Sequence, residues 1–377
     1  MLVGLSGWMW RWDRLTRLDF HAMIDEQEGH GAAAPDVSVV IVTWNTRDLL
    51  LQALHSLYAE TTSVTFEVVV VDNASEDGTS AAVNRLYPNV RLIELPTNSG
   101  FTGGNNIGFD VARGRHVLLL NSDTVVLPTT VEPLVRFLDE HPRAGTAGAR
   151  HLNADGSLQR SMDDVPTLLP DALYYTELYR VPAIRRWLSQ RCAWWSDHDV
   201  EREAGWVNGA CMMVRRDVIT EIGGLDERLF IYGEELDWCY RMKEVGWTVH
   251  FVPTAEVIHL GGQAMDSAAD RRAQLLMKGQ LHFHREHSTP RTAAAFTAIL
   301  AITAVVRLVA IRLVWGAEVV CRRRYDDAWA FVTTERIRVP GATASRMWRD
   351  VLRMCLTPAD PSPRSPLPAA PARDAAP

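Results

Sequence analysis

The chain has 377 residues, of which 47% are hydrophobic and 23% charged, so it can bury a core of roughly two to three domains and is not disordered throughout. The formal net charge is −7, but residues 301–355 carry ten Arg and five acidic residues, which leaves −12 for residues 1–300. An acidic body with a basic C-terminal segment is not typical of a nucleic-acid-binding protein, and the basic segment better matches a membrane surface.

The cysteines and the N-terminus indicate the compartment. The five cysteines are scattered without a Cys-x-x-Cys pair, which predicts neither a disulfide framework nor a thiolate zinc site and favours a reducing environment. The first 20 residues have no basic region before their apolar stretch and no small-residue cleavage site, so we expect no signal peptide and a catalytic part in the cytoplasm. Residues 1–36 are interpreted as a short amphipathic element followed by a linker.

The elements that follow predict an α/β fold. Residues 38–43 form a β-branched run of strand length, and residues 46–58 have apolar side chains at helical spacing. Further apolar runs of strand length follow at residues 66–71, 90–95 and 116–120. Uninterrupted apolar strands that alternate with helical segments indicate a mostly parallel sheet, buried on both faces and flanked by helices.

Three of these strands end in polar residues. Thr43 and Asn45 follow the first strand, Asp72 follows the second, and Asn121 and Asp123 follow the fourth. Any one of these groups has an ordinary explanation as a turn or helix cap. Ligands of such sheets bind outside the carboxyl ends of the strands, so three polar groups at one edge favour a binding site.

A glycine-rich segment follows the third strand. Residues 98–108 contain four Gly and three Asn and are predicted to form a loop that a ligand can approach closely. By composition alone, a flexible turn is the simpler explanation. No G-x-G-x-x-G follows the first strand and no G-x-x-x-x-G-K-[ST] occurs, which disfavours a nicotinamide dehydrogenase or a P-loop ATPase.

Four strings occur in order: SVVIVTWN, VVVVDNASEDGT, NSGFTGGNNIGF and LLLNSDT. Together they resemble the inverting family 2 glycosyltransferases with the GT-A fold, most closely the rhamnosyltransferase-like branch, over residues 37–262. The resemblance implies a nucleotide-sugar site in which Thr43, Asn45 and Asp72 hold the base and ribose. The other residues that it places in this site are Asn98, Gly100, Asn106 and Asn121.

The resemblance also implies a divalent metal, Mg²⁺ or Mn²⁺, on the diphosphate of the donor. The family's DxD motif is matched by Asn-Ser-Asp, so Asp123 corresponds to its metal-binding aspartate. His259 matches a histidine that often completes the metal site in this family, although a lone histidine is more often structural. A sugar that leaves with a nucleotide diphosphate develops negative charge on phosphate oxygens, which such a cation stabilises.

A second cluster contains Trp206 and Asn208 and then the string GGLDERLFIYGEELDWCYR at residues 223–241. Acidic residues favour helix N-termini, which explains one carboxylate but not the whole string. The string resembles the family's catalytic loop and helix, in which Glu235 takes the place of the base. The usual residue there is Asp, and Glu234 is the alternative base. Trp206, Asn208 and Asp237 match the acceptor side, and Asp237 can also pair with the residue at i+4.

The C-terminal part is predicted to be helical. Residues 292–320 are strongly apolar but contain Arg307 and Arg312, and the longest charge-free piece, residues 292–306, is shorter than the roughly 20 residues that span a bilayer. Two interpretations remain open: a helix at the cytoplasmic leaflet, or a helix packed on the catalytic domain or a second subunit. Residues 37–262 are thus assigned to a GT-A catalytic domain, 263–355 to a helical region that could associate with a membrane, and 356–377 to a disordered Pro/Ala-rich tail.

We therefore expect an inverting, metal-dependent glycosyltransferase of cell-surface glycan synthesis at the inner face of a bacterial plasma membrane. The expected donor is dTDP-rhamnose, with UDP-sugars behind it, and the expected acceptor is lipid-linked or a polysaccharide. The alternatives are a nucleotidyltransferase of similar layout, which would carry a basic phosphate loop after the first strand, and an inactive sugar-nucleotide-binding scaffold. The sequence does not predict the oligomeric state.

Overall fold

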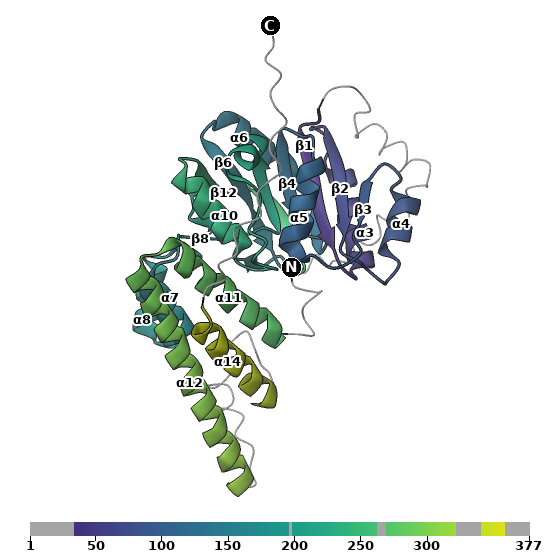
Figure 1. Cartoon of the computed structure of the whole chain (residues 1–377). Coiled ribbons are helices and arrows are strands. Elements are labelled where there is room, and N and C mark those ends of the chain that lie inside the picture. Colours follow the sequence, from purple (N-terminus) through teal and green to yellow (C-terminus); the bar gives the residue numbers. More distant parts are fainter. Residues whose placement is uncertain (1–33, 196–197, 262–268, 322–340, 359–377) are drawn as a thin grey trace.

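The computed structural model describes residues 34–195, 198–261, 269–321 and 341–358. The predicted N-terminal element and most of its linker lie outside the described residues, as does most of the predicted tail. Figure 1 shows two parts: a sheet with helices on both faces, and a group of helices below it that includes α7, α8, α11, α12 and α14.

Among the described residues, a ten-stranded mixed sheet has the order β3-β2-β1-β4-β11-β6-β12-β5, with β7 beside β6 and β9 beside β12. The strands β3, β2, β1 and β4 are parallel, β11 runs antiparallel between β4 and β6, and β12 is parallel to β6. A separate pair joins β8 and β10. The strands are β1 (Val37–Thr43), β2 (Phe66–Asp72), β3 (Arg91–Glu94), β4 (His116–Leu120), β5 (Thr124–Val126), β6 (Ala144–Leu152), β7 (Leu158–Gln159), β8 (Met162–Asp163), β9 (Arg202–Glu203), β10 (Trp206–Val207), β11 (Cys211–Arg215) and β12 (Thr248–His259).

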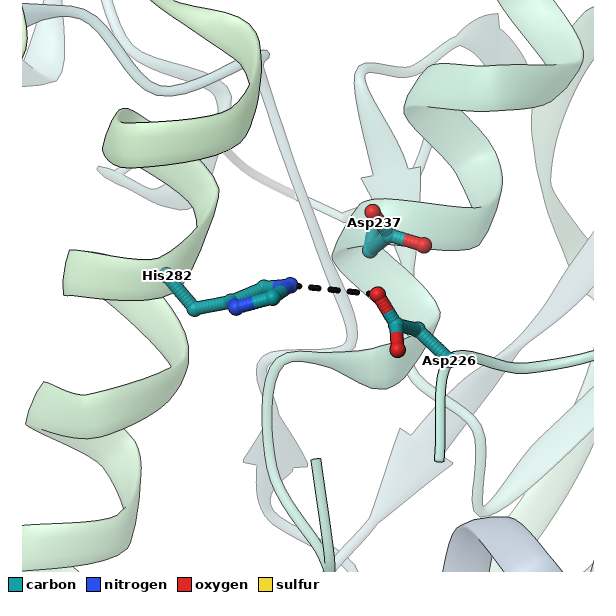
Figure 2. Close-up of side chains that lie close together, drawn as sticks. All are labelled: Asp226, Asp237 and His282. Carbon is teal, nitrogen blue, oxygen red and sulfur yellow. Dashed lines mark hydrogen bonds and ion pairs between the residues drawn. The ribbon is translucent and has the colours of Figure 1, made fainter. Parts of the chain in front are cut away.

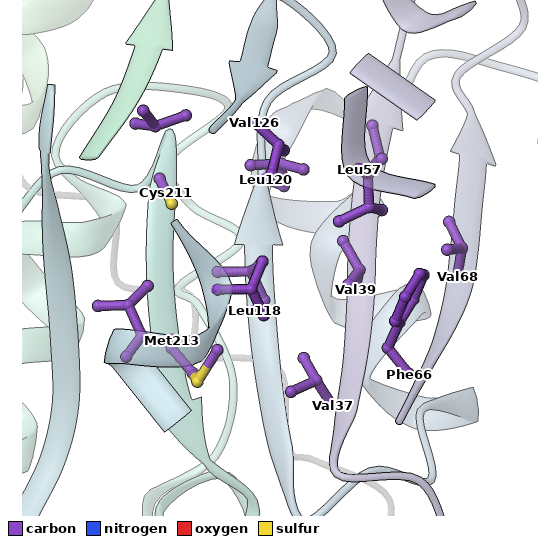
Figure 3. Packing of buried hydrophobic residues seen from close by; sticks show 14 of the residues in the cluster. Val37, Val39, Leu57, Phe66, Val68, Leu118, Leu120, Val126, Cys211 and Met213 are labelled. Atoms are coloured by element: carbon purple, nitrogen blue, oxygen red, sulfur yellow. The ribbon is translucent and has the colours of Figure 1, made fainter. Parts of the chain in front are cut away.

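Helices cover the sheet on both faces and bury two cores. On one face lie α3 (Arg47–Glu60), α4 (Thr79–Leu86) and α6 (Val131–Glu140); on the other lie α5 (Gly100–Val111), α9 (Arg216–Ile222) and α10 (Glu234–Glu244). Alternate residues of β1 face the two cores: Val39 packs with Leu57 of α3, whereas Val40 belongs to the core around Trp238. Figure 3 shows the first of these cores. Because side chains of a strand alternate, both faces of β1 must be apolar.

The predicted sheet needs one correction at its edge. The strands β1, β2 and β4 are buried on both faces, but β3 lies at the end of the sheet and its two central residues are only partly buried. An edge strand contacts a single neighbour, so its apolar run covers the sheet without being enclosed.

The predicted glycine-rich loop is largely a helix. Residues 98 and 99 precede α5, which includes the rest of the segment. A Cβ on Gly108 would lie 2.3 Å from Cγ1 of Val40, and one on Gly104 would lie 2.7 Å from Cγ1 of Val42. The glycines therefore let α5 lie directly on β1, and this tertiary packing outweighs their low helix propensity.

The C-terminal region forms a third core with the segment that follows β8. Its helices are α11 (Ala269–His287), α12 (Pro290–Cys321) and α14 (Gly341–Leu356), and the segment after β8 contributes α7 (Leu168–Tyr175), η2 (Leu178–Arg180), α8 (Pro182–Ser189) and η3 (Ala193–Trp195). Phe296 and Leu300 of α12 pack with Trp348 of α14, and Tyr175 of α7 meets the ring of Phe296 edge-on. The predicted apolar helix at residues 292–320 is confirmed as a helix, and one face of it packs on the protein.

Arg307, in the middle of α12, forms an almost fully buried ion pair. Its Nη2 lies 2.9 Å from Oε2 of Glu177, and both side chains are less than 10% exposed. Arg180, which is more exposed, also pairs with Glu177. The charge that would be costly at the centre of a bilayer is thus paired within the protein.

We expect Arg307→Met to lower the free energy of unfolding by about 3 kcal/mol, because it leaves Glu177 buried with only a peripheral partner. Adding Glu177→Gln should recover a large part of this loss. Arg312→Met, a matched change at an exposed position on the same helix, should change it by about 0.5 kcal/mol or less. Urea unfolding followed by fluorescence checks the series, and equal unfolding midpoints for the two Met variants would contradict the prediction.

Candidate active site

The carboxyl ends of β1 and β2 meet as predicted. Asn45 has φ 52°, and its Oδ1 accepts a hydrogen bond from the backbone N of Glu76 at 2.7 Å. The buried carboxylate of Asp72 accepts from the backbone N of Ser75 at 2.9 Å and from the hydroxyl of Ser80 at 2.5 Å. These bonds join the loops after the two strands. The structure therefore brings Thr43, Asn45 and Asp72 to one edge of the sheet.

The residues that follow β4 are joined to those that follow β1 through hydroxyl groups. Thr43 Oγ1 lies 2.9 Å from Thr46 Oγ1, which lies 3.0 Å from the hydroxyl of Ser122. Ser122 stands between Asn121 and Asp123, so the residues after β4 lie beside those after β1. Parallel pairing of β1 with β4 makes this meeting necessary.

The predicted nucleotide-sugar residues of the 98–108 segment have structural partners. Asn98 Oδ1 accepts from the backbone N of Gly100 at 2.8 Å, and the carbonyl of Gly100 accepts from Nδ2 of Asn73 at 2.9 Å. Asn106 is a correction. Its amide donates to the carbonyl of Leu225 and the carboxylate of Glu227 and accepts from the backbone N of Leu225, so this buried side chain fixes the loop after α9.

Asp123 and His259 converge across two strands. The strand β12 reaches His259 because it continues past an irregularity and pairs with β5, where His259 stands opposite Thr124. The Nε2 of His259 lies 3.3 Å from Oδ1 of Asp123 and 3.4 Å from Nδ2 of Asn121. The predicted pair of metal ligands is thus brought together.

The residues at this point fit a divalent cation. Asp123 offers a carboxylate, His259 offers an imidazole nitrogen, and Oδ1 of Asn121 is buried without a hydrogen-bond partner among the described residues. Carboxylate and amide oxygens suit Mg²⁺, and an imidazole nitrogen suits Mn²⁺ as well. These side chains are the ones that could hold such an ion.

Glu234 and Glu235 begin α10. Tyr232 and Gly233, with φ 70° and 98°, turn the chain into the helix. A Cβ on Gly233 would lie 2.7 Å from Cα of Gly279 in α11, so this approach of two backbones requires glycine. Glu234 is buried, whereas Glu235 is partly exposed and lines a cavity.

Burial raises the pKa of both glutamates, and the charge of Glu235 raises that of Glu234 further, well above its usual range. Burial also raises the pKa of Tyr232; the charge of Arg272 lowers it, and the charges of Glu234, Glu235 and Asp123 raise it by less. The ring of Tyr232 therefore lies within the electrostatic range of both the candidate base and the candidate metal carboxylate.

The cavity of about 410 Å³ opens beside Glu235. Glu235, Asp163, Asp164 and Asp171 supply carboxylates to it, and Arg191 is the one cation among the described residues that line it. The other described residues of the lining are Val165, Pro166, Thr167, Pro170, Tyr174, Tyr175, Leu188, Cys192, Trp194, Trp206, Tyr232, Gly233, Leu236, Leu276 and Gln280. The cavity is thus acidic and aromatic, and it is built by both α7 and α11.

Two tryptophans and a buried acid shape one wall of the cavity. The rings of Trp194 and Trp206 lie 6.4 Å apart at an interplanar angle of 25°. The carboxylate of Asp163 accepts from the backbone N of Asp164 and of Trp194, and burial raises the pKa of Asp163 to about 7. Trp206 therefore lines the same cavity as Glu235.

Asn208 belongs to a loop that passes next to the candidate base, Glu235. Its Oδ1 accepts from the backbone N of Ala210 at 2.9 Å, and a Cβ on Gly209 would lie 3.8 Å from Cβ of Glu235. The carbonyl of Ala210 in turn accepts from the backbone N of Asn121 at 3.0 Å. Residues 208–210 thus connect the candidate base to the candidate metal site.

Asp237 forms the predicted i,i+4 pair. Its side chain is fully buried and pairs with Nε of Arg241 and Nε2 of His287, each at 2.7 Å, and Asp237 is not among the described residues that line the cavity. It lies close to Asp226 and His282, as Figure 2 shows, and one ligand atom from each of these three residues lies within 4.8 Å of the others.

The cluster of Asp226, Asp237 and His282 joins α10 to α11, and the negative charges of its two carboxylates are balanced by two arginines. Burial alone would raise the pKa of Asp226, but hydrogen bonds from His282 and Arg228 outweigh this and keep it well below its usual range. The Nη2 of Arg228 lies 2.7 Å from Asp226, and the guanidinium of Arg241 serves Asp237. With a guanidinium on each carboxylate, the cluster is an ion-pair network rather than a metal site.

Sequence reasoning missed the segment that forms most of the cavity. Asp163, Asp171 and Trp194 lie between residues 163 and 195, where short helices and turns show no sustained periodicity. The aromatic pairs Tyr174-Tyr175 and Trp194-Trp195 were the available signal. Leu276 and Gln280 of α11 were missed because the C-terminal region was treated as separate from the catalytic domain.

The fold and the site define a GT-A glycosyltransferase. The model of the family Glycosyl transferase family 2 matches residues 38–201. An N-acetylglucosaminyl-diphospho-decaprenol L-rhamnosyltransferase of Mycobacterium tuberculosis is 31% identical over 59% of this chain and 75% of that protein. The low-salt glycan biosynthesis hexosyltransferase Agl10 of Haloferax volcanii is 25% identical over 59% of this chain and 67% of that protein.

A solved structure agrees on the fold. The mannosyltransferase PcManGT from Pyrobaculum calidifontis, in complex with GDP-Man and Mn²⁺, matches with a TM-score of 0.50 and 19% identity over 90% of this chain and 93% of that one. This chain belongs to glycosyl transferase family 2, and it is an enzyme of the hexosyltransferase class. The predicted family and the predicted GT-A fold are confirmed.

We expect Glu234→Gln to flatten the pH dependence of thermal stability. A carboxyl whose folded pKa is raised stabilises the fold fully below its unfolded pKa, and this contribution is lost as pH rises toward the folded pKa. From about pH 5 to about pH 8, the wild type should therefore lose more thermal stability than the variant. Thermal unfolding at several pH values checks this, and parallel curves for the two proteins would contradict it.

Proposed function

We propose that this protein is an inverting glycosyltransferase that uses Glu235 as its general base. The observation that carries the proposal is the position of Glu235, in an acidic and aromatic cavity on one side and next to the 208–210 loop that reaches Asn121 on the other. A base there can take a proton from an acceptor hydroxyl in the cavity while the donor lies at the sheet edge.

The donor lies, in this proposal, along the carboxyl ends of β1, β2 and β4, with its base and ribose near Thr43, Asn45 and Asp72. Asp123 and His259, with Oδ1 of Asn121, would hold Mg²⁺ or Mn²⁺. Such an ion supplies charge neutralisation to the departing diphosphate. The mannosyltransferase from Pyrobaculum calidifontis, which was solved in complex with GDP-Man and Mn²⁺, supports a divalent ion.

In the reaction, a carboxylate oxygen of Glu235 accepts the proton of the acceptor hydroxyl. The hydroxyl oxygen attacks the anomeric carbon on the face opposite the diphosphate, and the bond to the diphosphate oxygen breaks in the same displacement, with inversion. The raised pKa of Glu235 makes it a stronger base once it is ionised.

The proposed sugar is rhamnose from dTDP-rhamnose, with a UDP-sugar as the second possibility, and the proposed acceptor is lipid-linked or a glycan. The name of the Mycobacterium tuberculosis relative, a rhamnosyltransferase acting on a diphospho-decaprenol, supports both choices. The cavity is consistent with an uncharged acceptor sugar, since carboxylates accept hydrogen bonds from sugar hydroxyls and Trp206 can stack on a ring. In this proposal the phosphates of a lipid-linked acceptor lie outside the cavity, because its carboxylates would repel them.

We further propose that the protein works at the cytoplasmic face of the membrane through α12. By length and composition, the part of this helix at Pro290–Val314 could cross a membrane, since an 18-residue window within it has a mean hydropathy of 2.3. Ile302, Val306, Val309 and Leu313 are all more than half exposed and lie on one helical face, opposite the buried pair of Arg307 and Glu177. A helix with one packed face and one apolar exposed face suits a position at the lipid surface rather than across it.

The experiment for the base is Glu235→Gln, which keeps the side chain's shape and removes the carboxylate. We expect turnover to fall by a factor on the order of 10² to 10⁴, with donor affinity unchanged. The assay measures nucleotide diphosphate release from dTDP-rhamnose and a panel of UDP-sugars, with prenyl-diphospho-N-acetylglucosamine as acceptor and Mg²⁺ or Mn²⁺ present. Glu234→Gln is the paired variant. If it is the inactive one and Glu235→Gln turns over normally, the base is Glu234.

The membrane proposal is tested by Ile302→Glu with Val309→Glu. Each change puts a charge on the exposed stripe, so binding to vesicles of phosphatidylcholine and phosphatidylglycerol should weaken roughly tenfold or more. Val245→Glu changes an exposed valine after α10 and should leave vesicle binding unchanged. Equal sedimentation of all three proteins with vesicles would exclude the stripe as the contact surface.

A further inference from the structure

The far side of the His259 ring is bound by a glutamine. Nδ1 of His259 lies 2.6 Å from Oε1 of Gln159, while Nε2 of the same ring faces Asp123. Gln159 ends β7, the short strand that pairs with β6, and stands opposite His151 in that pair. The side chain therefore comes from a part of the sheet that none of the site motifs includes.

The orientation of the Gln159 amide is fixed by its other partners. Its Nε2 lies 3.2 Å from the backbone carbonyl of His259 and 3.0 Å from Oδ1 of Asn153. A backbone carbonyl can only accept a hydrogen bond, so the NH₂ group must point at it and the amide oxygen must point at the ring. Gln159 thus presents an acceptor to Nδ1 of His259.

Both ring nitrogens of His259 face an acceptor, but the contact of Nδ1 with Gln159, at 2.6 Å, is much shorter than that of Nε2 with the Asp123 carboxylate, at 3.3 Å. The shorter hydrogen bond favours the proton of a neutral ring on Nδ1 and leaves a lone pair on Nε2. Nδ2 of Asn121, which can only donate, lies 3.4 Å from this same Nε2 and agrees with an unprotonated nitrogen there. Histidines that bind metals generally donate their other N–H to an acceptor of this kind.

The glutamine is itself held in place. Asn153 opens the turn between β6 and β7, where its backbone N donates to the carbonyl of Ser157 at 2.8 Å. Below the site, the fully buried ring of His151 meets His259 edge-on, with ring centroids 5.6 Å apart. The His259 ring is thus supported from the turn and from β6.

We propose that Gln159 is a positioning residue, which holds His259 with Nδ1 protonated and Nε2 directed at the cation beside Asp123. The part of the proposal that concerns the cation rests on the proposed function, whereas the tautomer does not. Gln159 contacts neither sugar nor nucleotide in this role, and it acts only through the ring.

The experiment compares Gln159→Leu, which removes the three side-chain hydrogen bonds of Gln159 at similar size, with Gln159→Glu, which keeps an acceptor for Nδ1. Gln274→Leu is the matched control, because Gln274 bonds to Asp350 in the C-terminal region. Mn²⁺ binding is measured by electron paramagnetic resonance with and without UDP. Gln159→Leu should weaken it roughly 10- to 100-fold, while Gln159→Glu and Gln274→Leu should bind as the wild type does.

A second measurement needs no metal. Nitrogen NMR of the neutral His259 ring should show the Nδ1-protonated tautomer in the wild type and in Gln159→Glu, and a shifted or mixed tautomer in Gln159→Leu. An unchanged tautomer in Gln159→Leu, or unchanged Mn²⁺ affinity in that variant when Asp123→Ala abolishes binding, overturns the proposal. If Asp123→Ala and His259→Ala both leave Mn²⁺ binding intact, the metal assignment fails instead, and the NMR result alone decides the role of Gln159.

Discussion

The position of Glu235 depends on buried charges that join α10 to its neighbours. Asp237, two residues along the helix, is fixed by Arg241 and His287, and Arg241 also donates to the carbonyls of Ile222 and Gly224. Asp226 bonds to a histidine of the same helix α11. Losing one member would leave an unpaired buried charge, so the helix start and its glutamates have little freedom to move. The C-terminal region therefore forms part of the candidate site, although its helices lie beyond the residues that the family model matches.

Two adjacent carboxylates acquire different properties from this arrangement. Glu234 points into the protein and Glu235 lines the cavity, because neighbouring residues on a helix point about 100° apart. Each has one carboxylate oxygen that is buried without a hydrogen-bond partner among the described residues, and burial raises both pKa values. The carboxylate that reaches the cavity can exchange its proton with a substrate, whereas the enclosed Glu234 is made harder to ionise by burial and by the charge of Glu235. When their surroundings give two neighbouring carboxylates different pKa values, the two commonly have different roles in catalysis.

The sequence predicted the parts of the fold that depend on local pattern. The strands β1, β2 and β4 follow from uninterrupted apolar runs, and the polar residues after them meet because parallel strands end at one edge. The sequence did not predict the features that depend on tertiary packing. The glycines of α5 allow the helix to pack closely on β1, and Asn106 forms hydrogen bonds that hold the loop after α9. Both depend on tertiary contacts, so the sequence alone predicted neither the helix nor the role of Asn106. The cavity was missed because its residues come from segments more than 100 positions apart, such as Asp171 and Gln280.

The amino-acid composition of α12 cannot distinguish a membrane helix from a packed one, since both faces are apolar. What distinguishes them is Arg307, whose partner Glu177 lies just beyond α7. The pair turns one face of the helix toward α7 and leaves the stripe around Val306 outside. Because α7 also lines the cavity, a membrane that contacts the stripe would be separated from the cavity by the thickness of these two helices.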